Sequence, residues 1–506
     1  MKKIGIKRIV LFFTIILITG IVILLMLPVN YPVEPNYIQS NFEEIDPYQS
    51  ITKEEMISDI EFFVDRLLDI HPDPYRFVTE EEFINKVNEV INKIETASQE
   101  DILVLDFFRY VKEINAILRD EHITFRLPNF NHEKIFPYRV RIYEEIPYIL
   151  LPEDDGKQQF YELIAVNGLY VQDIISTLLK YQNSVLEHRQ RRGVEQDFFY
   201  LSYYFDWDDN YKIIYLDEDE KEREKAFNGI ASGNGRRDEF VPFSKKYLQG
   251  KGYQAPLLQL NSFFGFNINE YRDFIDDFFV QNHEQDYLII DLRQNGGGNA
   301  ELGHYVLNYL TDESYTTYHQ FQYKISNTLL NKFRYDVESE YYQMGIPNLF
   351  WSLPLYRFDP EHGSLLKNIF SAEVGSLVTE GPFKVTPPQS NYKFKGDVYL
   401  LIGNYTGSAA IDMAAAFKYN NLGTVVGQET SHPHSYFGNT GQSAYEMPNS
   451  GIIFAIPITF SLSAKGYDDQ RGVMPDIEIK YSLEDYLDSY VDLEIEYLKQ
   501  LIWEQM

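Results

Sequence analysis

Two apolar segments that each run into a turn of small residues constrain this chain more than any other feature. The first, residues 287–291, reads as a buried strand and continues as Leu292-Arg-Gln-Asn-Gly-Gly-Gly298. The second, residues 398–402, reads as another buried strand and continues as Gly403-Asn-Tyr-Thr-Gly-Ser-Ala-Ala410. A glycine turn leaves backbone N–H groups without a local acceptor, and the second turn lifts the hydroxyl of Ser408 onto the start of a predicted helix. One region thus combines bare amide donors with a single presented hydroxyl.

Strands and helices alternate from Pro256 to the C-terminal end of the chain. Expected strands cover residues 257–260, 288–292, 398–402, 424–426 and 452–458, and expected helices cover residues 268–279, 300–310 and 408–419. A further helix is expected from about Ser482. This alternation predicts α/β architecture.

Length and composition limit the possible classes of protein. A chain of 506 residues exceeds what one hydrophobic core supports, so two or three domains are expected at roughly 100–200 residues each. Its 45 basic and 76 acidic residues give a net charge of −31, which argues against nucleic acid or an anionic lipid surface as a partner. The chain has no cysteine, which excludes disulfides, thiolate metal sites and thiol nucleophiles. It also has no His-Glu-x-x-His segment, and we expect neither a metal nor another cofactor.

The N-terminus carries a candidate membrane anchor. Basic residues at positions 2, 3, 7 and 8 precede an uncharged apolar run from Ile9 to Leu27. As a helix, this run is just long enough to cross about 30 Å of hydrocarbon. The basic flank is expected to stay in the cytoplasm, so everything after Pro28 would lie outside. A cleaved signal peptide is the alternative, but such a segment usually ends in small residues, whereas this run ends Ile-Leu-Leu-Met-Leu.

Composition divides the chain into six expected segments. They are a cytoplasmic tail (1–8), the transmembrane anchor (9–27), an extended spacer (28–50), a helical region (51–130), a β-rich insert (131–250) and an α/β domain (251–506). Capping boxes at Thr52-Lys-Glu-Glu55 and Thr79-Glu-Glu-Glu82 predict two helix starts. The first helix should end near His71-Pro72, because the residue before proline disfavours helical backbone. A third helix is expected over residues 99–118.

The serine turn and the glycine turn together hold the parts of an acyl-transfer site. The field at a helix N-terminus favours developing negative charge, and the N–H of Ala409 is a first-turn donor without a partner in the helix. A nucleophile with nearby oxyanion donors is what acyl transfer requires. The competing interpretation is that Ser408 only caps the helix and the glycines only form a turn. There is no Gly-x-Ser-x-Gly segment, which argues against a lipase-type α/β-hydrolase.

A serine nucleophile needs a base, and three histidines are candidates. His122 follows the acidic pair Asp120-Glu121, and His432 and His434 flank a proline shortly after the serine. Each of them could equally be an ordinary solvated side chain.

These segments resemble the tail-specific (C-terminal processing) serine peptidases, in particular their histidine-bearing, tricorn-core-like branch. The resemblance covers about residues 60 to 480, with the motifs in family order. It rests on Ile290-Asp-Leu-Arg-Gln-Asn-Gly-Gly-Gly298, Thr406-Gly-Ser-Ala-Ala410, Met413-Ala-Ala-Ala-Phe417, Thr424-Val-Val-Gly-Gln-Glu-Thr430, Gly472-Val-Met-Pro-Asp476, Ile70-His-Pro72 and Arg119-Asp-Glu-His122. A weaker similarity of residues 161–178 to a PDZ core accompanies them.

The resemblance implies a role for each candidate residue. Ser408 would be the nucleophile, His122 the base and Asp469 its orienting acid, with Asp468 as the substitute. The oxyanion donors would be Gly297 or Gly298 together with Ala409. One departure matters: Pro433 stands where the processing peptidases place a lysine base, so a Ser–Lys dyad cannot be carried over. His432 and His434 remain alternative bases because they lie close to that position.

The resemblance also implies a fold and a function. We expect a crotonase/ClpP-like α/β catalytic domain with a helical N-terminal region, a PDZ-like β-rich insert and one N-terminal transmembrane helix. The expected protein is a membrane-anchored serine endopeptidase whose bulk lies outside the cytoplasm, in a bacterial envelope, and which hydrolyses protein or peptide substrates through an acyl-enzyme. A catalytically inactive, peptide-binding pseudoprotease on the same fold is the main alternative, and a structural surface protein is the third.

Overall fold

The structure is a computed structural model that describes residues 46–127, 134–153, 157–231, 240–250, 252–346, 351, 353–354, 363–438, 442–487 and 492–505. The predicted anchor, residues 9–27, lies outside the described residues. Within the described ranges, no helix has both the length and the apolar character needed to cross a membrane.

Three helices form the N-terminal part of the described chain. They are α2 (Lys53–Ile70), α3 (Glu80–Thr96) and α4 (Val104–Leu118). Both predicted capping boxes are confirmed. The side chains of Thr52 and Thr79 accept from the N–H groups of Glu55 and Glu82, and the carboxylates of these two glutamates accept from the N–H groups of the two threonines. The third helix begins at Val104 rather than near residue 99, since β2 (Asp101–Leu103) pairs with β1 (Ser50–Thr52).

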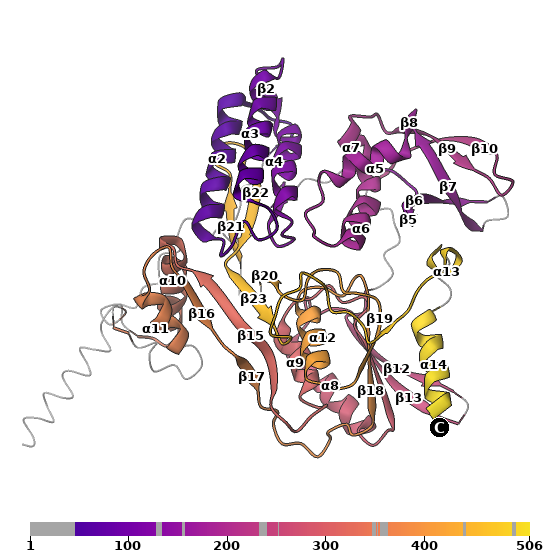
Figure 1. Ribbon diagram of the computed structural model, residues 1–506, viewed down its shortest axis with the longest axis vertical. Helices are drawn as coiled ribbons and strands as arrows, with labels where there is room; N and C mark the ends of the chain where they lie inside the picture. The colour runs from indigo at the N-terminus through magenta and orange to yellow at the C-terminus, as the bar shows by residue number, and fades with distance from the viewer. Residues whose placement is uncertain are drawn as a thin grey trace, which may run out of the picture.

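The α/β part is built on a six-stranded sheet with the strand order β12-β13-β14-β18-β19-β24. Its strands are β12 (Phe243–Gln249), β13 (Gln254–Leu260), β14 (Tyr287–Asp291), β18 (Asp397–Ile402), β19 (Thr424–Gly427) and β24 (Ile477–Glu478). All neighbours are parallel except β12, an antiparallel edge strand. Helices α8 (Ile268–Asn282), α9 (Ala300–Leu307) and α12 (Ala409–Tyr419) share a core with one face of the sheet, and α14 (Leu493–Gln505) shares a core with the other (Figure 1).

Burial on both faces explains why these strands read as continuous apolar runs. Leu288 and Ile290 pack on the face covered by α8, α9 and α12, while Ile289 packs on the face covered by α14. The predicted strands at 288–292 and 398–402 are adjacent and parallel, with Ile290 opposite Leu400. Their glycine and serine turns therefore leave the same edge of the sheet.

A second body follows the N-terminal helices in sequence and has its own core. Its sheet has the order β10-β9-β7-β6-β5, and β8 pairs with β7. The strands are β5 (Val140–Tyr143), β6 (Ile146–Pro152), β7 (Gln158–Val166), β8 (Leu169–Tyr170), β9 (Asn210–Leu216) and β10 (Glu222–Asn228), and the helices are α5 (Val171–Leu179), α6 (Glu187–Asp197), η1 (Phe198–Tyr200) and α7 (Leu201–Phe205). Residues 161–178, the segment with the weaker similarity to a PDZ core, form the end of β7, all of β8 and most of α5. We refer to residues 134–231 as the insert.

Two further sheets join the N-terminal helices to the α/β part. One contains β15 (Tyr315–Lys324), β16 (Leu377–Glu380), β17 (Phe383–Val385), β20 (Tyr436–Phe437) and β23 (Thr459–Ser463), and the other contains β3 (Thr124–Arg126), β21 (Gln442–Glu446) and β22 (Ile453–Pro457). The pairing of β22 with β3 brings the end of the helical region against the α/β part. The other described elements are β4 (Lys134–Ile135), β11 (Ile230–Ala231), α10 (Asn327–Gln343), α11 (Gly363–Ser371) and α13 (Leu483–Leu487).

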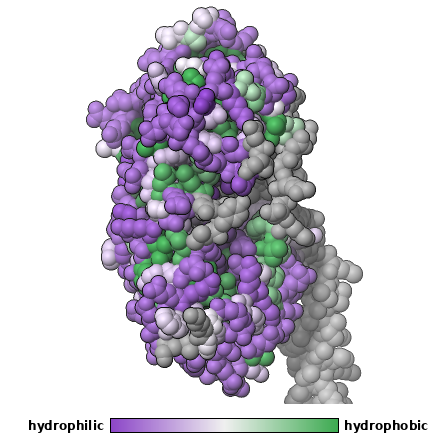
Figure 2. Space-filling view, turned by 90° about the vertical axis from the view of Figure 1, so that its right-hand side faces the viewer, coloured by the Kyte–Doolittle hydropathy of each residue, from purple (hydrophilic) through white to green (hydrophobic). Residues whose placement is uncertain are grey.

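The face of the molecule drawn in Figure 2 is mainly hydrophilic, with apolar side chains in separate small groups. This fits the excess of acidic over basic residues.

Candidate active site

Ser408 lies in a strained turn at the start of α12. Its φ of +49° and ψ of −125° are values that side chains other than glycine rarely adopt. Such strain persists only where the surroundings enforce it, and it concentrates at functional sites. Here the turn is held by Gly407, whose N–H donates to the carbonyl of Asn295 at 2.9 Å.

The glycine turn lies directly against this serine. A Cβ added to Gly297, where φ is +110°, would lie 2.6 Å from the Cβ of Ser408, so only glycine allows the approach. Gly298 has a φ of +132°, and its added Cβ would lie 2.2 Å from the carbonyl oxygen of Phe263. The two predicted turns therefore meet, as the sequence indicated.

The turn offers fewer free amides than predicted. The N–H of Gly297 donates to Oδ1 of Asn295 at 2.9 Å, so it is already committed and does not act as an oxyanion donor in this arrangement. Within the described residues, no hydrogen bond uses the N–H of Gly298 or of Ala409. These two remain available to an incoming oxyanion.

His432 contacts Ser408 through the backbone. Its Nε2 accepts from the N–H of Ser408 at 2.8 Å, and its Nδ1 donates to the carbonyl of Pro433 at 2.9 Å. A carbonyl can only accept, so Nδ1 carries the proton and the lone pair of Nε2 is occupied. Burial lowers the pKa of His432 to about 4, which keeps this ring neutral.

His122 packs against the groups around Ser408. Its ring stacks on Tyr436 with centroids 5.0 Å apart and meets His432 edge-on at 5.2 Å. Burial, with a smaller contribution from His432, lowers the pKa of His122 to about 4. Its Nδ1 lies 3.9 Å from Oδ1 of Asp120, and 19% of its side chain is exposed.

Asp120 links the two histidine motifs found in the sequence. Its Oδ2 lies 2.9 Å from Nε2 of His71, and its Oδ1 accepts from the N–H of His122 at 2.9 Å. Both carboxylate oxygens of a buried aspartate are thereby engaged, which fixes the loop that carries His122.

The predicted pairing of His122 with Asp469 does not occur in the structure. Asp469 lies 2.9 Å from Nε2 of His434 and also pairs with Lys465, while Asp468 pairs with Arg76. The other ring nitrogen of His434 lies 2.8 Å from Oγ of Ser463. Asp469 therefore reaches the residue 431–435 loop from a distant segment, although the loop has no acid of its own in the sequence.

Sequence reasoning missed Tyr436 and Asp412. The hydroxyl of Tyr436 donates to Oδ2 of Asp412 at 2.9 Å and lies near the side chain of Ser408. Burial raises the pKa of Asp412 to about 7, and burial with the Asp412 charge raises the pKa of Tyr436 well above its usual value. The sequence did contain a signal for Asp412. It is the one acid among residues 409–417, which are all buried in α12, and it stands one helical turn after Ser408.

Side chains of the insert form hydrogen bonds to the loop that carries His122. Nδ2 of Asn183 donates to the carbonyls of Asp120 and Ile123 at 3.0 and 3.1 Å. Nε of Arg189 donates to Oε2 of Glu121 at 2.9 Å. The candidate base is thus positioned by residues from outside the α/β part.

Comparisons with known proteins agree with this geometry. Residues 256–479 match peptidase family S41. The chain therefore contains a domain of that family and is a serine-type peptidase, which confirms the resemblance to the tail-specific peptidases drawn from its motifs. Its fold is the mixed α/β fold of this family with β-rich elements. No curated protein matches the chain.

Solved structures with a similar fold extend beyond the matched domain. Mature CPAF gives a TM-score of 0.62 at 15% identity, covering 89% of this chain and 97% of that one. A CPAF mutant gives 0.63 at 14% identity with the same coverage, and mature CPAF complexed with lactacystin gives 0.60 at 16% identity, covering 89% and 98%. At these identities the likeness concerns the fold alone.

Proposed function

We propose that this chain is a serine endopeptidase that cleaves protein or peptide substrates through an acyl-enzyme, with Ser408 as the nucleophile. The observation that carries the proposal is the strained backbone of Ser408 at the start of α12, packed against the glycine turn that leaves the N–H groups of Gly298 and Ala409 uncommitted. A nucleophile on a strained turn beside two amide donors is suited to binding the oxyanion of a tetrahedral intermediate.

His122 is the proposed base. The lone pair of His432 is occupied by the Ser408 N–H, and both ring nitrogens of His434 are engaged by Asp469 and Ser463. His122 contacts Tyr436 and His432, the two side chains that touch Ser408. Asp120 then takes the orienting role that the family resemblance implied for Asp469, because its Oδ1 accepts from the N–H of His122 at 2.9 Å and lies 3.9 Å from Nδ1 of the same residue.

The proposed reaction has two steps. The Oγ of Ser408 attacks the carbonyl carbon of the scissile peptide while His122 accepts the hydroxyl proton, and the oxyanion is bound by the N–H groups of Gly298 and Ala409. His122 then protonates the leaving amine as the C–N bond breaks. Water, deprotonated by the same imidazole, hydrolyses the acyl-enzyme and restores the Ser408 hydroxyl.

Labelling with a fluorophosphonate probe tests the nucleophile. The parent should be labelled and should cleave an unfolded, reduced casein, whereas Ser408→Ala should do neither while keeping the parent's thermal unfolding profile. His122→Ala should lose on the order of a thousandfold in turnover, by analogy with triad knockouts. A parent that is neither labelled nor active would be a pseudoprotease, and a Ser408→Ala variant that retains a tenth of the activity would exclude this serine as the nucleophile.

We further propose that the insert is PDZ-like, that the catalytic domain is crotonase/ClpP-like, and that residues 9–27 anchor the protein in a bacterial envelope with its bulk outside the cytoplasm. The basic flank and the apolar run support the orientation. The full chain should sediment with membranes and be digested by external protease in spheroplasts, while a variant lacking residues 1–30 should be soluble and active. A mature protein that begins after Leu27 would show a cleaved signal peptide instead.

A further inference from the structure

The imidazole of His122 lies flat against the ring of Tyr436. The two rings are nearly parallel, with an interplanar angle of 18° and centroids 5.0 Å apart. A Cβ added to Gly438, where φ is +127°, would lie 2.9 Å from Cδ2 of His122, so glycine at this position leaves room for the imidazole. Tyr436 in β20 and Gly438 directly after it therefore both contact the candidate base.

A buried acid on α12 anchors this tyrosine. The hydroxyl of Tyr436 donates to Oδ2 of Asp412 at 2.9 Å, and the two side chains are 5% and 3% exposed. Among the described residues, no cationic side chain pairs with Asp412. A buried carboxyl without a cation costs stability, so the packing of α12 alone gains nothing from an acid at this position. Asp412 instead ties the ring of Tyr436 to the helix that begins at Ser408.

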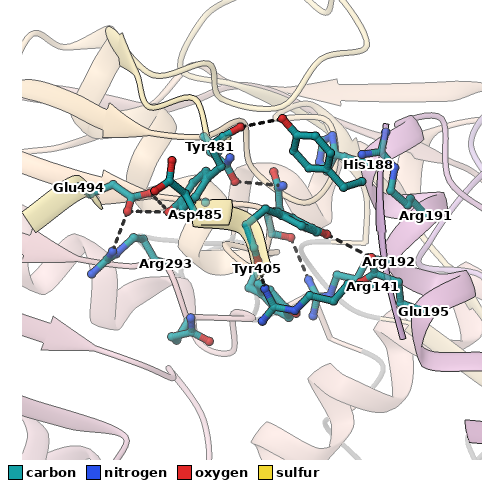
Figure 3. Close-up of a pocket in the computed structure, with 16 residues that line it drawn as sticks. Arg141, His188, Arg191, Arg192, Glu195, Arg293, Tyr405, Tyr481, Asp485 and Glu494 are labelled. Carbon is teal, nitrogen blue, oxygen red and sulfur yellow. Dashed lines mark hydrogen bonds and ion pairs between the residues drawn. The ribbon is translucent and has the colours of Figure 1, made fainter. Parts of the chain in front are cut away.

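The backbone of the nucleophile turn has other supports. Figure 3 shows Arg192 of the insert beside Tyr405, and its guanidinium carbon lies 3.3 Å from the centroid of that ring. Nη1 of Arg192 also donates to the carbonyl of Asn404 at 2.8 Å. Because these contacts hold the residues that precede Ser408, the anchored ring of Tyr436 is not needed to support the turn.

His122 acquires a positive charge only during the proposed reaction. When its imidazole accepts the proton of Ser408 it becomes an imidazolium, and burial disfavours this cation and lowers the pKa of His122 to about 4. His432 also disfavours the cation, whereas the charges of Asp120 and Glu121 favour it. Any group that stabilises the imidazolium more than the neutral ring would speed the reaction.

We propose that the ring of Tyr436, anchored by Asp412, stabilises the imidazolium that forms on His122 in both steps of the reaction. A cation within about 6 Å of an aromatic centroid is attracted by the negative face of the ring, and the stack of 5.0 Å lies inside this limit. The hydrogen bond from the Tyr436 hydroxyl to Asp412 polarises the phenol and strengthens this face. The inference rests on the proposed peptidase function, and it makes Tyr436 a positioning residue that acts through His122.

Fluorination of the ring tests the inference with the full chain in detergent. Tyr436→Phe and its 4-fluoro, 3,5-difluoro and 3,4,5-trifluoro derivatives have nearly the same shape, but each fluorine withdraws electron density from the ring face. The kcat for fluorescein-labelled, reduced casein should fall stepwise, by about fivefold over three fluorines, with KM nearly unchanged. The rate of labelling by a fluorophosphonate, which requires the base but no peptide, should fall in the same order.

Tyr309 offers a matched control. Its ring stacks on Phe279 with centroids 4.3 Å apart and an interplanar angle of 3°, and its hydroxyl donates to Oδ1 of Asp276 at 2.6 Å. This tyrosine is also anchored by a carboxylate, but the ring that it stacks on never carries charge. The same four substitutions at Tyr309 should keep kcat within about twofold of the parent. Thermal unfolding of every variant separates an effect on the ring from a loss of folding.

A double-mutant cycle tests the role of Asp412. Asp412→Leu removes the anchor and should lower kcat by about threefold when Tyr436 is present, but it should have no effect in the Tyr436→Phe background. Asp412→Leu should unfold at the parent's temperature or above it, because an apolar side chain replaces a buried acid that has no cation. Equal losses of kcat in the two backgrounds would overturn the anchoring role.

Failure of the peptidase proposal gives a different result from failure of this inference. A parent that neither cleaves casein nor reacts with the fluorophosphonate would overturn both. An active parent whose His122→Ala variant is equally active would place the base elsewhere and overturn the inference. If the parent is active and depends on His122, but kcat is equal across the fluorinated series, the inference alone is wrong, and Ser408 and His122 keep their roles.

Discussion

At the scale of single residues, the backbone of Ser408 makes a prediction about stability that is independent of catalysis. Its φ of +49° strains any residue with a Cβ, and glycine alone adopts such a conformation freely. Ser408→Gly should therefore have a free energy of unfolding about 1 kcal/mol higher than Ser408→Ala, and the preference of N-cap positions for glycine over alanine acts in the same direction. Urea unfolding of both inactive variants measures the difference. A more stable alanine variant would mean that the turn relaxes to an ordinary conformation.

The environment of His122 sets the expected pH dependence. A base must be neutral to accept a proton, and burial lowers the pKa of His122 to about 4. The kcat/KM for a peptide without titratable groups should therefore rise as pH increases through about 4 and level off before pH 6. A histidine with the ordinary pKa of about 6.5 would instead place the rise between about pH 6 and pH 7.5.

The pH profile has two controls. Activity after incubation at each pH and return to neutrality separates titration from unfolding. His434→Ala, which removes a ring engaged by Asp469 rather than one packed beside Ser408, should cost far less turnover than His122→Ala. The reverse ranking would move the base to the residue 431–435 loop.

Local sequence was enough to predict Ser408 and the glycine turn, but not their partners. The turns stand out because each follows an apolar strand, and that pattern is visible within a dozen residues. Asp469 lies beside His434, Asp120 beside His71, and Tyr436 beside Asp412, at separations of 35, 49 and 24 residues. Such contacts depend on how distant segments pack, which no local pattern encodes.

At the scale of elements, the insert should control the geometry of the base. Asn183 donates to the carbonyls of Asp120 and Ile123 and thereby holds the loop on either side of His122. Asn183→Ala should lower kcat about tenfold with KM nearly unchanged, because displacing a catalytic group by a fraction of an ångström slows the chemical step. Gln172→Ala removes an equivalent amide-to-carbonyl bond elsewhere in the insert, to Glu145, and should leave kcat unchanged. Equal kinetics in both variants would make the contacts of Asn183 purely structural.

The sequence predicted well the strands that are buried in the main sheet. It did not predict which sheet a strand joins. Strands β14 and β18 were predicted almost to the residue because both faces of their sheet are covered. The strand expected at 452–458 exists as β22, but it pairs with β3 and β21 rather than in the main sheet. The single helix expected from Ser482 is two helices, α13 and α14. Which sheet a strand joins depends on partners far away in the sequence.

At the scale of the whole molecule, a histidine outside the site should contribute to the pH dependence of folding. The Nε2 of His304 on α9 is buried without a hydrogen-bond partner among the described residues, and burial lowers the pKa of His304 to about 4. In the unfolded chain its pKa is about 6.5, so between these values the unfolded state binds one more proton than the folded state. Stability should therefore fall as pH falls through this window, by about 1.4 kcal/mol per pH unit for this residue.

His304→Phe isolates this contribution, because phenylalanine keeps the ring and removes the titration. Between pH 7 and pH 5 the parent should lose roughly 2 kcal/mol more of its free energy of unfolding than the variant, as measured by urea denaturation at each pH. His319→Phe, at an exposed histidine on β15, should follow the parent. Peptidase activity at pH 7 should be unchanged in both variants, since neither residue touches Ser408. If His304→Phe loses stability with falling pH as steeply as the parent, His304 is protonated in the folded state, and the packing of α9 admits water to its ring.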